Sequence, residues 1–194
     1  MKTARMNSTD FNRLVKATKN FVSEPHRPIL SYIHIEFDAN TQRITAVACD
    51  GYKLSVEHAK ADCDESFSCY VKRDAHIPGG GDVQITLCEE PQQVRLESAD
   101  FSVSYNQPAG NYLDWKRVVP TTPPGYSMTF NGNLLLDALK ASKASCSRVF
   151  TESLVIEFRD PGEPIVIRTN EDNIKLVLPL RMQKREGEAG DAAH

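Results

Sequence analysis

Only two stretches of this 194-residue chain have the spacing of an amphipathic helix, and this limits the folds that it can adopt. In residues 11–22 and 135–142, apolar or small side chains recur every three or four positions, which gives each stretch one face that can be buried. The first stripe consists of Phe11, Leu14, Val15, Thr18, Phe21 and Val22, and the second of Leu135, Ala138, Leu139 and Ser142. The sequence therefore predicts two helices.

Polar residues that favour helix ends flank the two stripes. Residues 8–10, Ser-Thr-Asp, offer N-caps for the first helix, and Asn131 or Asn133 offers one for the second, because their side chains accept hydrogen bonds from free backbone N–H groups. Pro25 and Pro28 end the first helix, since proline has no N–H to donate. The expected helices are therefore short and clearly bounded.

The sequence between and after the helices is made of short runs typical of β-strands. Asp50-Gly51 joins two of these runs and is typical of the tight turn of a hairpin. The predicted strands cover residues 30–37, 43–49, 53–58, 66–72, 83–88, 93–97, 101–105, 128–130, 154–158, 164–169 and 173–180. We expect an α+β fold in which the two helices pack on antiparallel sheets, with the order strand, helix and three strands near each end of the chain.

The composition is that of an ordinary globular protein, with 40% hydrophobic and 25% charged residues. The net charge of −3 gives no general affinity for nucleic acid, so any contact with DNA would come from a local basic face. The five cysteines are odd in number and lack CxxC spacing, which argues against a disulfide framework or a zinc site and favours a reducing compartment. No run approaches the roughly 18 apolar residues of a membrane span, so we expect a cytoplasmic protein that makes no membrane contact.

The sequence shows no recognisable catalytic arrangement. The five histidines are scattered without metal-ligand spacing, and Gly79-Gly80-Gly81 lacks the pattern of a phosphate-binding loop. We therefore expect no catalytic residue, no metal and no cofactor, and a protein that is not an enzyme. An enzyme of unknown type is one functional hypothesis, and no arrangement of residues in the sequence supports it.

Four segments resemble, in the same order, the beta subunit of bacterial DNA polymerase III, the DNA sliding clamp family. Residues 27–30 (Arg-Pro-Ile-Leu) and 44–55, which contain Cys-Asp-Gly-Tyr-Lys-Leu, are similar to a loop and a hairpin of the family's middle domain. Residues 111–120 are similar to the family's link to its third domain, and residues 176–182 to its C-terminal ending. The resemblance covers residues 6–182 and implies the clamp fold.

The resemblance also implies how the chain is divided. Residues 1–120 correspond to the middle domain without its second helix, because the proline and glycines of residues 76–82 cannot hold one. Residues 121–182 correspond to the second half of the family's third domain, and the polar tail of residues 183–194 is expected to be disordered. The family's first domain has no counterpart.

The function implied by the resemblance is that of a clamp-like processivity factor in DNA replication. Such a protein encircles double-stranded DNA through backbone contacts that carry no sequence information, and it docks short peptides of a polymerase or another replication protein. The peptide-binding pocket would consist of Leu30, Cys49, Gly51, Tyr52, Lys53, Leu54, Pro120, Leu176, Leu178, Pro179 and Leu180. The DNA-binding residues would be Arg13, Lys16, Lys19, His26, Arg27, Lys140, Lys143 and Arg148. A ring would require several copies of so short a chain, which makes the chain a candidate homo-oligomer.

The same residues can also be interpreted as structural residues that have no role in binding. The lysines and arginines near the helices can be solvated faces, Asp50-Gly51 can be a turn and nothing more, and the leucines can be core. A second functional hypothesis keeps the pocket but not the ring: a clamp-derived peptide-binding module or accessory protein that does not encircle DNA. Cys49 and Tyr52 replace the family's usual threonine and common histidine, so we expect a different peptide preference.

Overall fold

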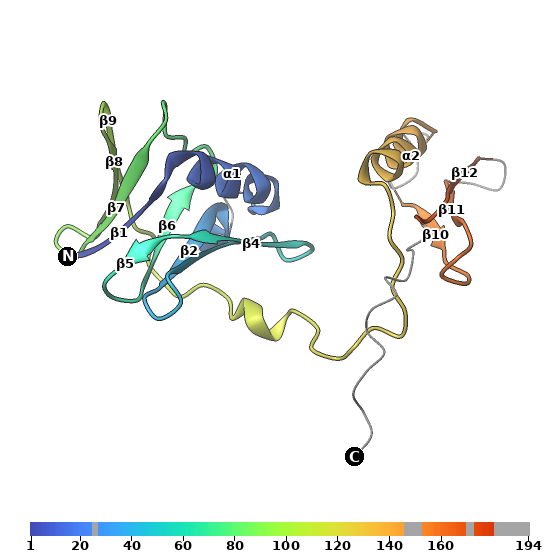
Figure 1. Ribbon diagram of the computed structural model, residues 1–194, viewed down its shortest axis with the longest axis horizontal. Helices are drawn as coiled ribbons and strands as arrows, with labels where there is room; N and C mark the ends of the chain where they lie inside the picture. Colours follow the sequence, from blue (N-terminus) through green and yellow to red (C-terminus); the bar gives the residue numbers. More distant parts are fainter. Residues whose placement is uncertain (25–26, 146–152, 170–172, 181–194) are drawn as a thin grey trace, which may run out of the picture. The chain divides into compact units, whose positions relative to one another are not determined.

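A computed structural model describes residues 1–24, 27–145, 153–169 and 173–180 of the chain. The chain forms two compact units, Met1–Pro120 and Thr121–His194 (Figure 1). The assignment of these units to the middle and C-terminal regions of a clamp stays a prediction.

The first unit contains one α-helix and two antiparallel sheets. Its elements are β1 (Lys2–Asn7), α1 (Ser8–Thr18), β2 (Tyr32–Asp38), β3 (Arg43–Cys49), β4 (Leu54–Lys60), β5 (Asp62–Cys63), β6 (Phe67–Lys72), β7 (Asp82–Cys88), β8 (Gln93–Ser98) and β9 (Phe101–Asn106), with short 3-10 turns at Lys19–Phe21, Pro28–Ser31 and Trp115–Arg117. One sheet has the strand order β5-β1-β7-β8-β9 and the other the order β4-β3-β2-β6. Every strand pair in both sheets is antiparallel.

The core of the first unit lies between the inner faces of these two sheets and α1. The buried stripe of α1 includes Phe11, Leu14 and Val15, as its helical spacing predicts. It packs against strands of both sheets (Figure 1). Residues of both sheets, such as Ile35 and Ile85, belong to the same buried cluster as this stripe. Because strand residues alternate between faces, the neighbours of the core residues in β2 and β3 form an outer face on the four-stranded sheet.

The N-cap of α1 differs from the one expected. The side chain of Asn7 accepts a hydrogen bond from the Thr9 backbone N–H at 2.9 Å, so Asn7 is the cap and Ser8 is already helical and buried. The expectation of a cap within residues 8–10 is wrong because β1 runs to Asn7 and passes directly into the helix. The spacing of the apolar residues predicts that a helix forms here, but it does not predict the residue at which the helix begins.

The second unit places one helix on a three-stranded antiparallel sheet. Its elements are α2 (Gly132–Ser145), β10 (Val155–Glu157), β11 (Ile165–Arg168) and β12 (Ile174–Val177), with the strand order β10-β11-β12. The Asn131 side chain accepts a hydrogen bond from the Asn133 N–H at 3.0 Å and so begins α2. Ile165, Ile167 and Val177 are buried, and Leu135, Ala138 and Leu139 of α2 pack against them, as the second stripe predicts.

The strand predicted at residues 128–130 is wrong. This segment has no strand conformation, although Met128 and Phe130 pack against the core of the second unit. The Thr129 carbonyl accepts a hydrogen bond from the Leu180 N–H at 2.7 Å, but β12 already ends at Val177, so no ladder continues to it.

The predicted fold class is otherwise confirmed, since two α-helices lie on antiparallel sheets. Two strands lie outside the predicted ranges: the two-residue β5, and β1, which was expected only from the order of the elements. Residues 76–82 contain no helix, as their proline and glycines predict. Among the described residues, no helix is long and apolar enough to cross a membrane.

Candidate functional site

The β3–β4 hairpin turn is built around the side chain of Asp50. Its Oδ1 atom accepts hydrogen bonds from the backbone N–H groups of Tyr52 at 2.9 Å and Lys53 at 3.0 Å. The first of these bonds is the main reason that the pKa of Asp50 lies below its usual value, and the nearby Lys53 lowers it further. The ammonium of Lys53 lies 3.6 Å from Oδ2 of Asp50. The turn is therefore held in one conformation by its own residues.

Arg27 fixes the same turn from outside. Its Nη1 atom donates a hydrogen bond to the Asp50 carbonyl at 3.1 Å. Gly51 has a φ of +93°, and a Cβ at this position would collide with the Arg27 guanidinium. The left-handed backbone favours glycine here, and any larger residue would also have to displace the Arg27 guanidinium. Arg27, expected to contact DNA, makes this contact to the hairpin.

A connecting segment covers part of the outer face of the four-stranded sheet. The Gln107 side chain exchanges two hydrogen bonds, of 2.8 and 3.0 Å, with the backbone of Tyr70 in β6. The ring of Tyr112 stacks on His34 of β2 at 4.8 Å between centroids. Trp115 donates its indole N–H to the Glu36 carboxylate at 2.9 Å. We call residues 107–117 the strap.

The strap buries polar groups on this face. Burial lowers the pKa of His34, which Glu36 partly offsets, and burial raises the pKa of Tyr112 above its usual range. Within the described part of the chain, neither Nδ1 of His34 nor the hydroxyl of Tyr112 has a hydrogen-bond partner. The strap is therefore held by stacking and by its two ends rather than by these two polar atoms.

The predicted pocket residues of the first unit gather around the hairpin. Cys49 and Leu54 face each other across β3 and β4, so they share the outer face of the sheet. Cys49 is buried and Leu54 half-buried, whereas Tyr52 at the turn is 94% exposed. The other members are half-buried Leu30 and exposed Gly51, Lys53 and Pro120.

The predicted pocket residues of the second unit form an exposed row. Leu176, Leu178 and Leu180 occupy alternate positions at the end of the last strand and beyond it, and they are 63%, 69% and 52% exposed. Pro179 between them is half-buried. The alternative interpretation, in which these three leucines are core residues, is therefore wrong.

A groove of about 470 Å³ lies beside the hairpin, between the end of α1 and the turn. Four of its lining residues are cations, namely Lys19, Arg27, Lys53 and Arg73, and two are carboxylates, namely Glu24 and Asp50. We call it the basic groove. Sequence reasoning assigned no role to Arg73 and Glu24, because their positions in loops far apart in the chain give no periodic signal that would bring them together.

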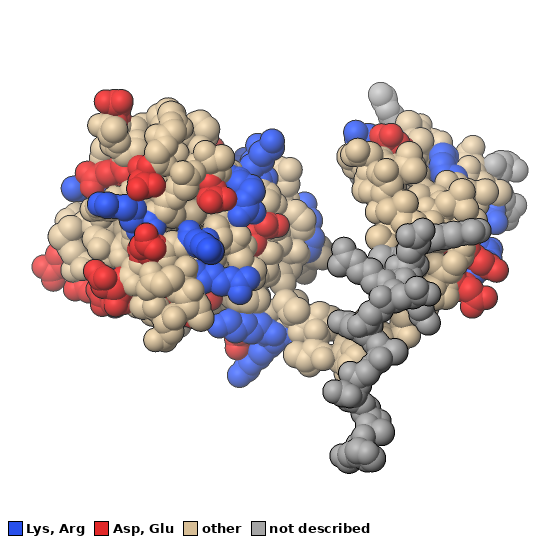
Figure 2. All heavy atoms as spheres, in the orientation of Figure 1, with Lys and Arg blue, Asp and Glu red and all other residues tan. Residues whose placement is uncertain are grey.

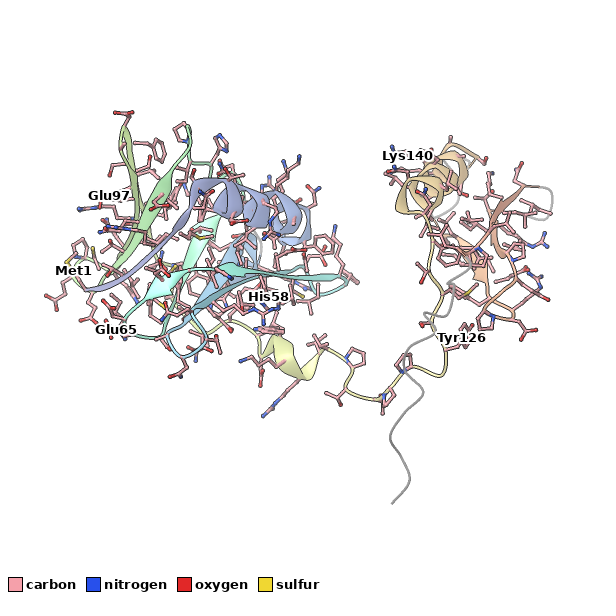
Figure 3. All side chains as sticks on the ribbon, viewed as in Figure 1. Met1, His58, Glu65, Glu97, Tyr126 and Lys140 are labelled. Carbon is pink, nitrogen blue, oxygen red and sulfur yellow. The ribbon has the colours of Figure 1, made fainter. Side chains whose placement is uncertain are left out.

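The predicted DNA-binding residues fall into three groups. Lys16 and Lys19 are exposed at the end of α1 and just beyond it, and Lys140 and Lys143 are exposed on α2, where Figure 3 labels Lys140. Arg13 is instead engaged within the first unit: it lies 3.5 Å from Asp10 and 3.4 Å from Glu57, and it donates to the His58 carbonyl at 2.9 Å. His26 and Arg148 lie outside the described residues, as does the tail of residues 183–194.

Charge is unevenly spread over the first unit. In Figure 2, Lys and Arg spheres gather toward the edge where α1 ends and the β3–β4 hairpin lies, and many Asp and Glu spheres lie toward the opposite edge. A net charge of −3 therefore hides a local basic region. Among the described residues, no group of three or more His, Cys, Asp or Glu side chains is arranged to hold a metal ion.

No protein-family model and no curated protein sequence matches the chain. Its structure is nevertheless similar to solved bacterial clamps. The DNA polymerase sliding clamp of Bacillus subtilis aligns with a TM-score of 0.76 at 17% identity, over 91% of this chain and 49% of that chain. The chain has the sliding-clamp fold. The DNA polymerase III beta chain of Streptococcus pneumoniae gives 0.76 at 16% identity, over 93% and 50%. The C. crescentus beta sliding clamp gives 0.72 at 20% identity, over 91% and 50%.

The comparison confirms the fold expected from the four sequence segments. The chain spans about half the length of these clamps. At 14–20% identity the likeness speaks for the fold alone, and what the chain binds is a separate question.

Proposed function

We propose that the chain is a clamp-like, non-enzymatic replication protein that docks short apolar peptides of a polymerase or another replication protein. It also binds double-stranded DNA without reading its sequence. The sliding-clamp fold, which extends over more than nine-tenths of the chain, supports the class of function. The observation that carries the peptide-binding part is the exposed leucine row of Leu176, Leu178 and Leu180.

Exposed leucines in a row are costly to leave in water. Burial of apolar surface is worth about 25 cal/mol per Å², and large apolar side chains that are exposed side by side are typical of interaction sites. A short peptide with leucine and aromatic side chains would cover such a row. The geometry of alternate positions supports docking along the strand direction.

The hairpin supports the same proposal from the first unit. Asp50 and Arg27 hold the turn in place, so little conformational entropy is lost when a partner binds there. Tyr52 projects from the turn, and aromatic side chains of this kind are frequent anchors in interfaces. Half-buried Leu54, which pairs with the buried Cys49 across the hairpin, supplies apolar surface next to it.

Isothermal titration with a synthetic peptide tests this proposal. The peptide carries leucine and phenylalanine at its centre and neutral flanks. We expect Leu178→Asp to weaken binding at least about tenfold, since a carboxylate placed against an apolar anchor costs more than about 1.4 kcal/mol. Leu134→Asp on α2 is the matched control, because Leu134 is 57% exposed in the same unit and lies outside the pocket. Equal affinities for the two variants would contradict the pocket assignment.

A further inference from the structure

The basic groove is a surface that the predicted pocket does not include. Its walls come from the end of α1 and the following 3-10 turn, from the hairpin turn, and from Arg73 in the turn after β6. A smaller groove of about 240 Å³ continues from it, because Ser23 and Arg73 line both, and adds Lys72 and Tyr32. Together they form one extended path along the surface of the first unit.

The cations in the basic groove exceed its carboxylates by two, four against two. Asp50 is already used by the hairpin turn, where it accepts two backbone N–H groups and faces Lys53. Arg27 donates to a carbonyl, which leaves its charge uncompensated. Within the described part of the chain, no carboxylate lies within 4.0 Å of the charged groups of Lys19, Arg27 or Arg73. The groove therefore has unpaired positive charge, and its Arg27 is held in place by the hydrogen bond to the hairpin.

The groove shares its rim with the predicted peptide pocket. Tyr52 and Lys53 belong to both, and Lys53 also lies over the ring of Phe21 at 5.4 Å to the centroid. Val22, which is buried, gives the groove an apolar patch in its lining. A chain that docked at the hairpin would pass directly into a basic channel.

A peptide fits this channel better than a nucleic acid strand. Glu24 and Asp50 line the basic groove and Asp74 the smaller one, so a continuous phosphate backbone would run past three carboxylates. A peptide can place acidic side chains on the cations and backbone N–H groups near the carboxylates. The unpaired charge is also limited to a few residues, which suits a short acidic segment.

From this arrangement we infer that the basic groove binds an acidic segment that flanks the apolar anchor of a partner peptide, and that Lys19 and Arg73 select such partners. The inference rests on the proposed function, since it extends a peptide whose apolar part docks at the hairpin of the first unit along the surface of that same unit. It adds a specificity that the apolar pocket alone would not give.

Two synthetic peptides with the same leucine–phenylalanine centre provide the test. One has a flank of three aspartates and the other a flank of three glutamines. At low salt we expect the acidic peptide to bind roughly five- to tenfold more tightly, as two or three partly exposed ion pairs would give, and we expect this preference to shrink at 0.5 M salt. Arg73→Glu and Lys19→Glu should each reduce the preference, with the affinity of the neutral peptide unchanged. Arg95→Glu, on the other sheet, is the matched control and should leave the preference intact.

The outcomes separate the two proposals. If both peptides bind equally and Arg73→Glu has no effect, the inference about the groove is wrong while the apolar pocket stands. If only the acidic peptide binds, and Arg73→Glu abolishes this, the groove stands and the apolar pocket is wrong. A ten-nucleotide oligothymidylate is the third probe: Arg73-dependent binding tighter than that of the acidic peptide would overturn the inference in favour of single-stranded nucleic acid.

Discussion

Single residues determine the shape of the hairpin at the candidate site. Gly51 has a positive φ and lies against Arg27, whereas Gly79 has a φ of +80° and no atom near the place of a Cβ. The two glycines therefore share the backbone requirement, but only Gly51 has the close neighbour. This pair allows the effect of the Arg27 contact to be measured apart from the effect of the backbone.

We expect Gly79→Ala to lower the free energy of unfolding by about 1 kcal/mol, the usual penalty for a left-handed non-glycine residue. Gly51→Ala should cost about 0.5–1 kcal/mol more, because the new methyl group must displace Arg27 from the Asp50 carbonyl and break one exposed hydrogen bond. Urea unfolding followed by circular dichroism measures both values. In an Arg27→Ala background, where this hydrogen bond is already absent, Gly51→Ala should cost only about as much as Gly79→Ala, about 1 kcal/mol. Equal losses for the two glycines would show that Arg27 does not constrain the turn.

At the scale of elements, the strap is the feature that sequence periodicity describes least. Residues 107–117 contain one proline, one glycine and one asparagine near their start and show no helical or strand period, and most of them form no regular element. In the structure they bind the outer face of the four-stranded sheet at Tyr70, His34 and Glu36. The strap thus stabilises the sheet that carries the hairpin.

Tyr112→Ala should therefore destabilise the first unit by about 2–3 kcal/mol, since it removes a stacked and largely buried ring. Tyr126→Ala is the control: this tyrosine is 50% exposed (Figure 3 labels it), and its loss should cost less than about 0.5 kcal/mol. Trp115, the one tryptophan of the chain, lies in the strap and reports its release by fluorescence during urea unfolding. A Tyr112 variant as stable as the Tyr126 variant would mean that the strap adds nothing to the sheet.

At the scale of the whole molecule, the chain carries a sliding-clamp fold in about half the length of the clamps that it matches. Lys16 is exposed on α1, and Arg13 is held by neighbouring carboxylates. The proposal of DNA binding therefore depends more on Lys16 than on Arg13.

We expect retention on double-stranded DNA to fall as salt rises, and Lys16→Glu to reduce the slope of log affinity against log salt by about 1, the value for one lost phosphate contact. Light scattering at tens of micromolar, with and without DNA, gives the number of copies. Arg95→Glu serves as the control for a change of charge away from α1. A strict monomer whose DNA retention is absent or insensitive to salt would favour the peptide-binding module over the clamp.

The sequence alone determined the elements and their class. Helical spacing identified the buried faces of α1 and α2, alternation and turn residues identified ten of the twelve strands to within a few residues, and the four clamp-like segments indicated the fold. These features are local, because each depends on residues close together in the chain. The predicted strand at residues 128–130 was wrong because a strand requires a partner, and β12 ends before it reaches this segment.

Only the tertiary structure decided which side chains are exposed and which are engaged. It showed that Leu176, Leu178 and Leu180 are exposed and are not core residues, that Arg13 and Arg27 make contacts within the first unit, and that Arg73 joins Lys19 and Lys53 in one groove. The physical reason is that these properties depend on contacts between residues far apart in the sequence. A sequence pattern gives only the spacing of residues along the chain. The residues that a side chain contacts depend on how the sheets, the strap and the turns pack.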